Sequence, residues 1–332
     1  MRVLLTGNHV YPIASARGVG RRVKPWPSGS GQRLQDLTAR GLAEEGHEVV
    51  YYLTRPAIAP APRGVTIVDR WPADVDVMHT LLLPEEFEEE ARERGVPHIA
   101  VLHLHPGSRG LPPPQPREEW VYVSRWLAES LGGTRVVRNG VDPAEYVYSE
   151  TKGDYALFMS SMDWCIGKGL DVAIALSKKI GFRLVVAGTA RSEEALAAAM
   201  AMCEAGGAEF VGDVQGSEKA DLLAGARALL HPSRYQEACP LTIMEALVSG
   251  TPVITTPWGA SSELMTPEVG FLCETETDYA EAFARLGAIR PRACRDYALS
   301  EFHYRRMVAE YVREYETALG AFTTALSHPS TE

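Results

Sequence analysis

At 332 residues, the chain is longer than one hydrophobic core usually supports, so two folded domains are expected. Its composition, 45% hydrophobic and 23% charged, is that of a globular protein and excludes a disordered chain. A formal net charge of −10 at pH 7 excludes a general nucleic-acid binder, because that binding needs clustered lysine and arginine. The five cysteines are dispersed without a CxxC pair, which predicts neither a disulfide framework nor a zinc site and favours a reducing cytoplasm. No apolar run is long enough for a signal peptide or a membrane span, so no stable membrane insertion is expected.

Short apolar runs alternate with helical patterns along the chain, and this alternation predicts parallel sheets wrapped by helices. The strand-like runs are 2–6, 48–53, 99–103, 155–159, 183–187, 228–231 and 252–255. Between the first two runs, residues 32–45 place leucines at helical spacing and end at Gly46, a residue suited to a left-handed helix stop. Near the end of the chain, 295–319 has the pattern of one long helix.

The break between the domains is expected near Tyr148, after the turn-forming segment 138–142 and before a new strand-helix-strand series. We therefore predict an N-terminal domain over 1–147, a C-terminal domain over 148–300, a terminal helix over 301–320 that returns to the N-terminal domain, and a tail over 321–332.

The loop after the first strand is unusually long and holds Trp26 together with four cations, Arg17, Arg21, Arg22 and Lys24. Long ordered loops in compact domains tend to be functional. We interpret this loop as an acceptor-binding lid that uses Arg17 and Trp26, and a solvated surface loop is the alternative.

The segment 231–253 reads HPSRYQEACPLTIMEALVSGTPV, which is a strand end, a glutamate, a second glutamate inside a helix, and a further strand. Glu237 is expected in a loop at the carboxyl end of a strand, where open α/β sheets bind ligands. Pro240 suits the first helical turn, and the free N–H groups there would bind a diphosphate without a metal. Glu245, about one turn further, would accept hydrogen bonds from two ribose hydroxyls.

This segment closely resembles the signature of retaining family 4 glycosyltransferases. Matching segments follow in the family's order over nearly the whole chain: 29–31, 46–49, 97–103, 138–142, 187–189, 211–213, 259–263, 270–272 and 302–315. The resemblance implies the GT-B fold, an α/β architecture of two Rossmann-like domains whose parallel sheets face each other across a cleft, with a C-terminal helix crossing back. It also implies a retaining, metal-independent, hexosyltransferase-like enzyme that moves a sugar from a UDP- or GDP-type donor to a hydroxyl of a small-molecule or glycan acceptor.

The resemblance implies roles for individual residues of this sequence. It implies no cofactor beyond the nucleotide-sugar co-substrate, and no metal ligand. The implied catalytic residues are Glu237 at the transferred sugar, His103 at a strand end facing it, and Lys168 at the diphosphate. His105, two residues on, is assigned to the acceptor. The implied donor-binding residues are Gly31, Ser161, Lys168, Gly188, Arg191, Val211, Glu237, Ala238, Cys239, Pro240, Leu241, Thr242 and Glu245.

The chain departs from the family at Ser161, which stands where an arginine is expected to clamp the diphosphate together with Lys168. Either a substitute cation fills that role, with Arg17, Arg191 and Arg234 as candidates, or donor affinity is weaker. The other functions considered are a GT-B sugar-nucleotide epimerase, a phosphorylase and a non-catalytic nucleotide-sugar-binding subunit. A dehydrogenase is disfavoured because Leu34 occupies the third glycine position of a dinucleotide fingerprint. The composition is compatible with natural-product or glycoconjugate biosynthesis.

Overall fold

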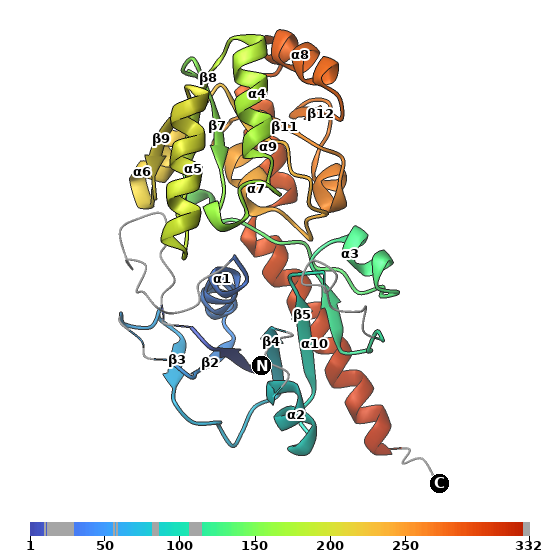
Figure 1. Ribbon diagram of the computed structural model, residues 1–332. Helices are drawn as coiled ribbons and strands as arrows, with labels where there is room; N and C mark the ends of the chain where they lie inside the picture. Colours follow the sequence, from blue (N-terminus) through green and yellow to red (C-terminus); the bar gives the residue numbers. More distant parts are fainter. Residues whose placement is uncertain are drawn as a thin grey trace. The chain divides into compact units, whose positions relative to one another are not determined.

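The computed structural model describes residues 1–9, 11, 30–55, 57, 59–81, 86–105 and 115–327, with the backbone alone for 325–327. The chain divides into two compact units (Figure 1). The N-terminal unit consists of the described residues up to Gly140 together with the helix that begins at Tyr304, and the C-terminal unit is Val141–His303. The division falls between residues 140 and 141, whereas the sequence placed it between 147 and 148.

The N-terminal unit is built on a six-stranded parallel sheet with the order β3-β2-β1-β4-β5-β6. Five of the six residues of β1 are buried, as expected for a strand covered on both faces. The strands are β1 (Arg2–Gly7), β2 (Glu48–Leu53), β3 (Val65–Val68), β4 (Val77–Leu81), β5 (His98–Leu102) and β6 (Trp120–Tyr122), and the helices are α1 (Ser30–Glu44), α2 (Glu86–Glu93), α3 (Arg125–Ser130) and α10 (Tyr304–Ser327).

Helix α10 packs against α1, β4 and β5 of the N-terminal unit. At the crossing with α1, a Cβ on Gly41 would lie 2.6 Å from the Val308 Cγ2, so only glycine permits this close approach. Further along α10, the Tyr315 hydroxyl lies 2.7 Å from the His79 Nδ1 in the buried interior. The last helix is therefore an integral part of the N-terminal unit.

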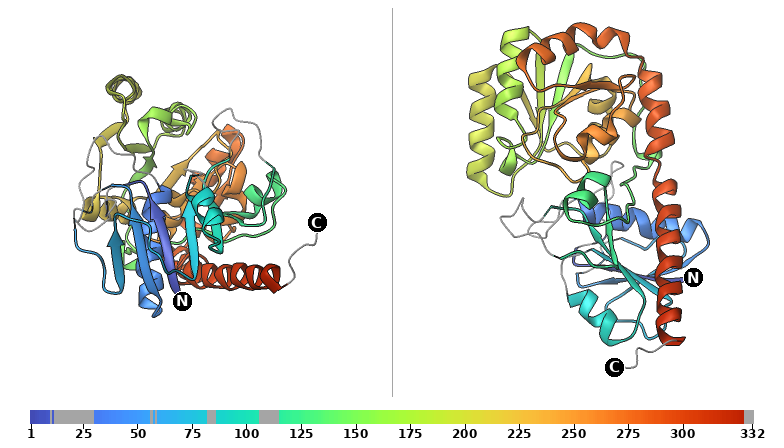
Figure 2. Two further views of the ribbon diagram at one scale, coloured as in Figure 1. Left: turned by 90° about the horizontal axis from the view of Figure 1, so that it is seen from below. Right: turned by 90° about the vertical axis from the view of Figure 1, so that its right-hand side faces the viewer.

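The C-terminal unit repeats the same architecture, with the strand order β12-β11-β10-β7-β8-β9 and helices on both faces of the sheet (Figure 2). Counted from its own first strand, each sheet has the order 3-2-1-4-5-6 of dinucleotide-binding folds, which confirms the predicted Rossmann-like domains. Its elements are β7 (Tyr155–Met159), α4 (Leu170–Ile180), β8 (Arg183–Ala187), α5 (Glu193–Gly206), β9 (Glu209–Gly212), α6 (Gly216–Gly225), β10 (Ala228–His231), α7 (Leu241–Val248), β11 (Val253–Thr255), β12 (Gly270–Leu272), α8 (Glu276–Arg285) and α9 (Pro291–Glu301), with short 3-10 helices η2 (Pro143–Glu145), η3 (Met162–Trp164), η4 (Gly259–Leu264) and η5 (Leu286–Ala288).

The prediction of one helix over 295–319 is wrong, because the structure has two helices, α9 and α10, in its place. The break is at Phe302 and His303, where the Phe302 carbonyl accepts a hydrogen bond of 2.8 Å from the Val141 amide and His303 forms a bridge with Val141. These backbone groups are therefore engaged outside a helix. Helix α10 then continues to Ser327, into the segment predicted as a tail. Among the described helices, none is both long and apolar enough to cross a membrane.

Candidate functional site

The loop between β7 and α4 positions Lys168 through two glycines. Gly169 has a φ of +85°, and a Cβ there would lie 2.1 Å from the Pro232 carbonyl oxygen. A Cβ on Gly167 would lie 2.0 Å from the ring of Tyr235. Gly169 therefore has to be glycine for this loop to lie against the segment that follows β10, which brings Lys168 beside the predicted Glu237.

Glu237 is the centre of a compact ionic cluster that lies after β10. Its Oε2 accepts a hydrogen bond from the Lys168 Nζ, and its Oε1 lies 2.8 Å from the His231 Nε2. The Glu237 side chain is only 14% exposed. Burial alone would raise its pKa, but the adjacent His231 and Lys168 outweigh burial and hold the pKa of Glu237 well below its usual range. The carboxylate is therefore ionised and fixed in orientation.

His231 was absent from the predicted site residues, although it is the last residue of β10. Its Nδ1 lies 3.0 Å from the Thr255 Oγ1 in the neighbouring strand β11, while its Nε2 faces Glu237. The signal for it was present, because a polar side chain at the carboxyl end of a buried parallel strand lies where such sheets bind ligands.

The segment after β11 supports Glu237 from a third side. Gly259 has a φ of +61°, and a Cβ there would lie 2.5 Å from the Glu237 amide nitrogen. The Ala260 amide donates a hydrogen bond of 2.9 Å to the Glu237 carbonyl. Because β7 and β10 are adjacent in the sheet where the strand order reverses, the whole cluster lies at the switch point of the fold.

Helix α7 begins at Leu241, and Pro240 is its N-cap with a φ of −70° and a ψ of 111°. Pro240 was predicted to lie in the first helical turn, but its extended ψ places it one residue before that turn, as the N-cap. No side chain caps this helix among the described residues. The N–H groups of the first turn have no partner within an α-helix and attract anions. Ala238, Cys239 and Pro240 are buried, and Leu241 and Thr242 are half-buried.

Glu245 lies one turn into α7 and is 2% exposed. Its Oε1 accepts hydrogen bonds from the Tyr146 hydroxyl at 2.9 Å and from the Lys219 Nζ at 2.7 Å. Neither Tyr146 nor Lys219 was predicted, because each is distant from Glu245 in the sequence and belongs to no motif. The carboxylate predicted to bind ribose thus already holds two donors, and its ribose role stays a prediction.

Ser161 is exposed, and its hydroxyl donates a hydrogen bond of 3.0 Å to the Asp163 Oδ2. The Asp163 carboxylate also accepts hydrogen bonds from the backbone amides of Arg191 and Ser192, the closest of them at 3.0 Å. The position expected to hold a phosphate-clamping arginine is therefore part of a turn that joins the ends of β7 and β8.

The three candidate substitutes for that arginine differ. The Arg234 guanidinium holds Asp171 through two contacts of 2.7 Å. The Arg191 guanidinium is exposed and makes no hydrogen bond or ion pair within the part of the chain that the structure describes. Arg17 lies outside the described residues, as does Trp26. Arg191 is thus the described candidate whose charge is available.

Gly188 and Val211 lie at the ends of β8 and β9. Gly188 has a φ of +153°, and a Cβ there would lie 1.9 Å from the Ser160 carbonyl oxygen, so glycine is required for packing at this point. Its amide donates a hydrogen bond of 2.7 Å to the Gly212 carbonyl, and Val211 is half-buried. These contacts shape the strand ends, and a role at the nucleotide stays a prediction.

In the N-terminal unit, the structure brings Gly31 and His103 together. A Cβ on Gly31, the second residue of α1, would lie 3.4 Å from the His103 Cδ2 at the end of β5. Burial lowers the pKa of His103 to about 4, so its imidazole is neutral at pH 7. The His105 ring lies 5.7 Å from the Trp126 ring.

Residues 153–288 match the family model described as glycosyl transferases group 1, and this range contains Lys168, His231, Glu237 and Glu245. AviGT4, a glycosyltransferase involved in avilamycin A biosynthesis, is a similar solved structure: it is 28% identical, covers 96% of this chain and 98% of its own, and has a TM-score of 0.74. The chain thus has the GT-B fold of these solved glycosyltransferases, and most of its C-terminal unit matches the group 1 family model.

Two more distant structures share the fold of this chain. Sucrose-phosphate synthase from Thermosynechococcus elongatus is 15% identical, with 96% and 99% of the chains covered and a TM-score of 0.75. HepE of Anabaena, solved with UDP and glucose, is 13% identical, with 96% and 100% covered and a TM-score of 0.71. The comparison with curated protein sequences gave no match.

Proposed function

We propose that this glycosyltransferase moves a sugar from a nucleotide-sugar donor, of UDP or GDP type, to an acceptor hydroxyl with retention of anomeric configuration and without a metal in the transfer step. The observation that carries the proposal is the ionic cluster of Lys168, Glu237 and His231 beside the start of α7. It joins a fixed carboxylate, an ammonium group and a helix N-terminus within one loop system. UDP is the favoured nucleotide because the HepE structures contain UDP or UDP-glucose.

In the proposed reaction the bond between the anomeric carbon and the diphosphate breaks, and a bond from the acceptor oxygen to that carbon forms on the same face. The acceptor proton passes to the departing phosphate oxygen, so no separate base is required. The positive end of α7 and the Lys168 ammonium stabilise the charge that develops on the diphosphate. Because it is ionised, Glu237 binds sugar hydroxyls and stabilises positive charge at an oxocarbenium-like centre.

The neutral His103 suits a hydrogen-bonding role toward the transferred sugar rather than a role as a cation. Gly31 beside it leaves room for a ligand to approach the start of α1. His105, Arg17 and Trp26 are proposed for the acceptor. This acceptor is a small molecule or a glycan, and the likeness to AviGT4 supports a natural-product setting.

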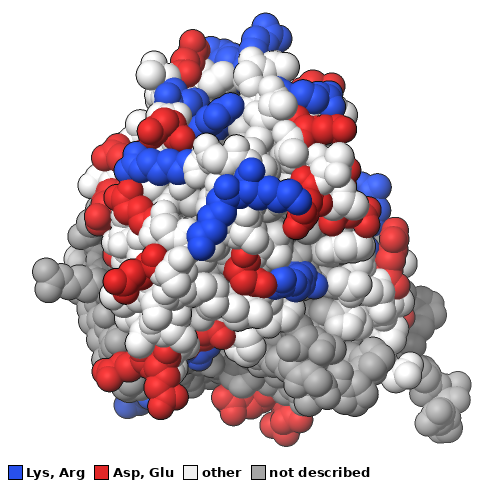
Figure 3. All heavy atoms as spheres, turned by 45° about the horizontal axis from the view of Figure 1, so that its top comes forward, with Lys and Arg blue, Asp and Glu red and all other residues white. Residues whose placement is uncertain are grey.

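A nucleic-acid partner is not proposed. On the face of the molecule drawn in Figure 3, lysine and arginine side chains are interspersed with aspartate and glutamate rather than gathered into a basic patch. The net charge of −10 points the same way, because phosphate backbones are bound by clustered cations.

The test begins with a thermal-shift screen against UDP-, GDP- and dTDP-sugars, followed by turnover and product stereochemistry with the donor that binds. Glu237→Gln should lower kcat at least about a hundredfold while donor affinity stays within about threefold, because the lost charge acts mainly in the transition state. Glu268→Gln, at an exposed glutamate of the same unit, is the matched control and should behave like the parent. An unchanged kcat in Glu237→Gln contradicts the proposal, as does a product of inverted configuration.

A further inference from the structure

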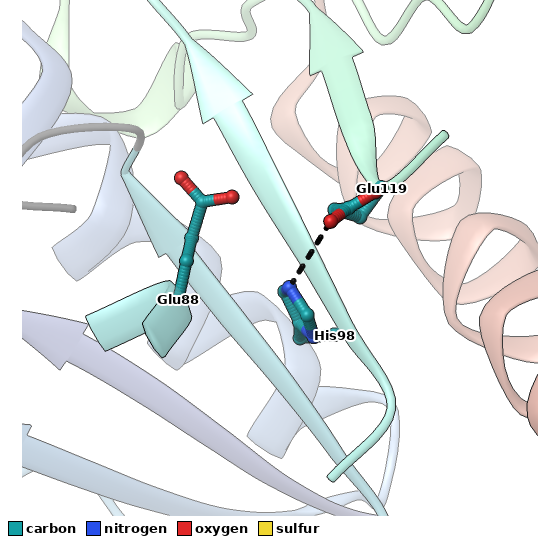
Figure 4. Close-up of side chains that lie close together, drawn as sticks. All are labelled: Glu88, His98 and Glu119. Carbon is teal, nitrogen blue, oxygen red and sulfur yellow. Dashed lines mark ion pairs between the residues drawn. The ribbon is translucent and has the colours of Figure 1, made fainter. Parts of the chain in front are cut away.

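A histidine and two glutamates converge at the amino-terminal edge of the sheet in the N-terminal unit (Figure 4). Glu88 comes from α2, His98 is the first residue of β5, and Glu119 immediately precedes β6. One ligand atom from each residue lies within 4.8 Å of the other two. This His/Glu cluster contains none of the residues assigned to the proposed transfer reaction.

Two atoms of the His/Glu cluster are buried without a hydrogen-bond partner among the described residues. They are the Glu88 Oε1, in a side chain that is 0% exposed, and the His98 Nε2, in a side chain that is 9% exposed. Leaving such groups unsatisfied costs roughly 1–3 kcal/mol each. A ligand that accepts electron pairs from both atoms would remove that cost.

The hydrogen bonding of His98 determines which atom it presents to the cluster. Its Nδ1 lies 3.3 Å from the Val96 carbonyl oxygen, and a carbonyl oxygen can only accept, so the Nδ1 carries the hydrogen. In the neutral ring, the Nε2 then presents a lone pair toward two carboxylates, with the Glu119 Oε1 at 3.9 Å. An electron pair that faces two carboxylates is unfavourable unless a cation or a proton lies between them.

The neighbouring donors contact mainly the other oxygen of Glu88. The Trp120 Nε1 donates to the Oε2 at 3.4 Å, and the guanidinium groups of Arg92 and Arg117 lie 3.7 and 3.8 Å from that same oxygen. Arg92 also lies 3.8 Å from the Glu119 Oε1. Both arginine side chains are more than two fifths exposed, so they can turn toward solvent when a cation enters.

We propose that His98, Glu88 and Glu119 bind one divalent transition-metal ion, with Zn²⁺ as the best fit and water as the fourth ligand. One imidazole nitrogen with two carboxylates suits Zn²⁺, whereas Mg²⁺ and Ca²⁺ prefer oxygen ligands alone. The bond from the Nδ1 to the Val96 carbonyl is the outer contact that metal-binding histidines usually make. Ligand atoms around tetrahedral Zn²⁺ lie roughly 3.3 Å apart, so the 3.9 Å between the His98 Nε2 and the Glu119 Oε1 would have to shorten. The Glu119 side chain is 25% exposed and can move to shorten it.

The proposed ion is structural rather than catalytic. His98 and His103 lie five positions apart at the two ends of β5, which at about 3.3 Å per residue separates them by roughly 16 Å. An ion bound at His98 would tie α2 to the starts of β5 and β6. It is therefore expected to act on the stability of the N-terminal unit and not on the transfer step.

The test uses the full chain, stripped with EDTA, dialysed free of chelator and titrated with ZnSO₄ by calorimetry and by thermal denaturation. We expect saturable binding of one Zn²⁺ per chain and a rise in Tm. His98→Gln and Glu119→Gln should each weaken binding at least about tenfold, whereas Glu118→Gln, at the exposed neighbouring position, should not. With Co²⁺, the parent should give a visible absorption band that His98→Gln lacks.

Arg92→Gln separates a metal site from an ion-pair network. If the cluster binds a metal, removing this competing cation should tighten Zn²⁺ binding. If the arginine already completes the cluster, the variant should lose Tm and gain nothing from Zn²⁺, and the proposal is then wrong. Equal Zn²⁺ affinity of Glu119→Gln and Glu118→Gln would likewise overturn it, because the binding would be adventitious.

Discussion

Replacing Lys168 by Met would remove one of the two side chains that hold the Glu237 carboxylate while keeping roughly the length of the side chain. The two side chains are 25% and 14% exposed, so the pair is largely buried. Removing one partner of a fully buried pair costs about 3–5 kcal/mol. His231 would remain 2.8 Å from the carboxylate and retain part of that interaction. We therefore expect the C-terminal unit to lose about 2 kcal/mol of unfolding free energy at pH 7.

Urea denaturation followed by circular dichroism measures this loss. With a slope of about 2 kcal/mol per molar urea, 2 kcal/mol corresponds to a midpoint lower by roughly 1 M. Lys178→Met is the matched control, because Lys178 is exposed and, among the described residues, donates to the Ala205 carbonyl alone; this variant should change stability by less than about 0.5 kcal/mol. Equal midpoints for the two variants would refute the assigned strength of the pair.

The same variant carries a pH signature. The pKa of Glu237 in the folded protein is held below its ordinary value of 4.5, so its contribution to stability is complete above that value and is lost as pH falls further. In Lys168→Met the folded pKa moves back toward 4.5. The difference in stability between parent and variant should therefore shrink below about pH 4.5, and a difference that grows there would contradict the sign.

Glu245→Ala should weaken nucleotide-sugar binding by about 1.5–3 kcal/mol in calorimetry, because charge-assisted bonds to ribose would be lost, and unchanged affinity would remove the ribose assignment. Arg191→Gln should weaken donor binding roughly two- to fivefold, as expected for an exposed charge. Arg234→Gln should leave donor binding unchanged, because Asp171 holds the Arg234 guanidinium. Equal effects of the two variants would contradict the choice of Arg191. Initial rates of transfer should survive EDTA at temperatures below thermal unfolding, and complete loss that Mn²⁺ restores would show a catalytic metal.

The sequence was most informative where a strand is continuously apolar. The run 155–159 and the run 228–231 were both predicted and both occur, as β7 and β10, because burial on two faces leaves no polar positions. The predicted runs do not include strands β3, β4, β6, β9 and β12. Strands β3, β6, β9 and β12 are no longer than four residues, and β4 contains the buried polar residues His79 and Thr80.

Within the site, the residues of the 231–253 motif were predictable and their partners were not. Glu237 and Glu245 were predicted from their setting in that motif, between a strand end, a helix and the next strand, whereas Tyr146 and Lys219 reach Glu245 only through tertiary packing. The His/Glu cluster was invisible for the same reason. Its three residues are 10 and 21 positions apart, and a spacing of that kind matches no metal-binding motif.

The serine at position 161, where the family resemblance predicts an arginine, matters because the Lys168 ammonium is already paired with a carboxylate. In the structure the Lys168 ammonium is paired with Glu237, so a donor diphosphate would enter a site whose nearest cation is largely neutralised. The start of α7 contributes the equivalent of roughly half a positive charge, which is less than the charge of a diphosphate. On the proposed function, either a further cation contributes or the donor is bound more weakly. Asp163 accepts hydrogen bonds from the backbone amide of Arg191, and the Arg191 guanidinium makes no hydrogen bond or ion pair among the described residues, so we propose Arg191 as the described arginine that takes this role.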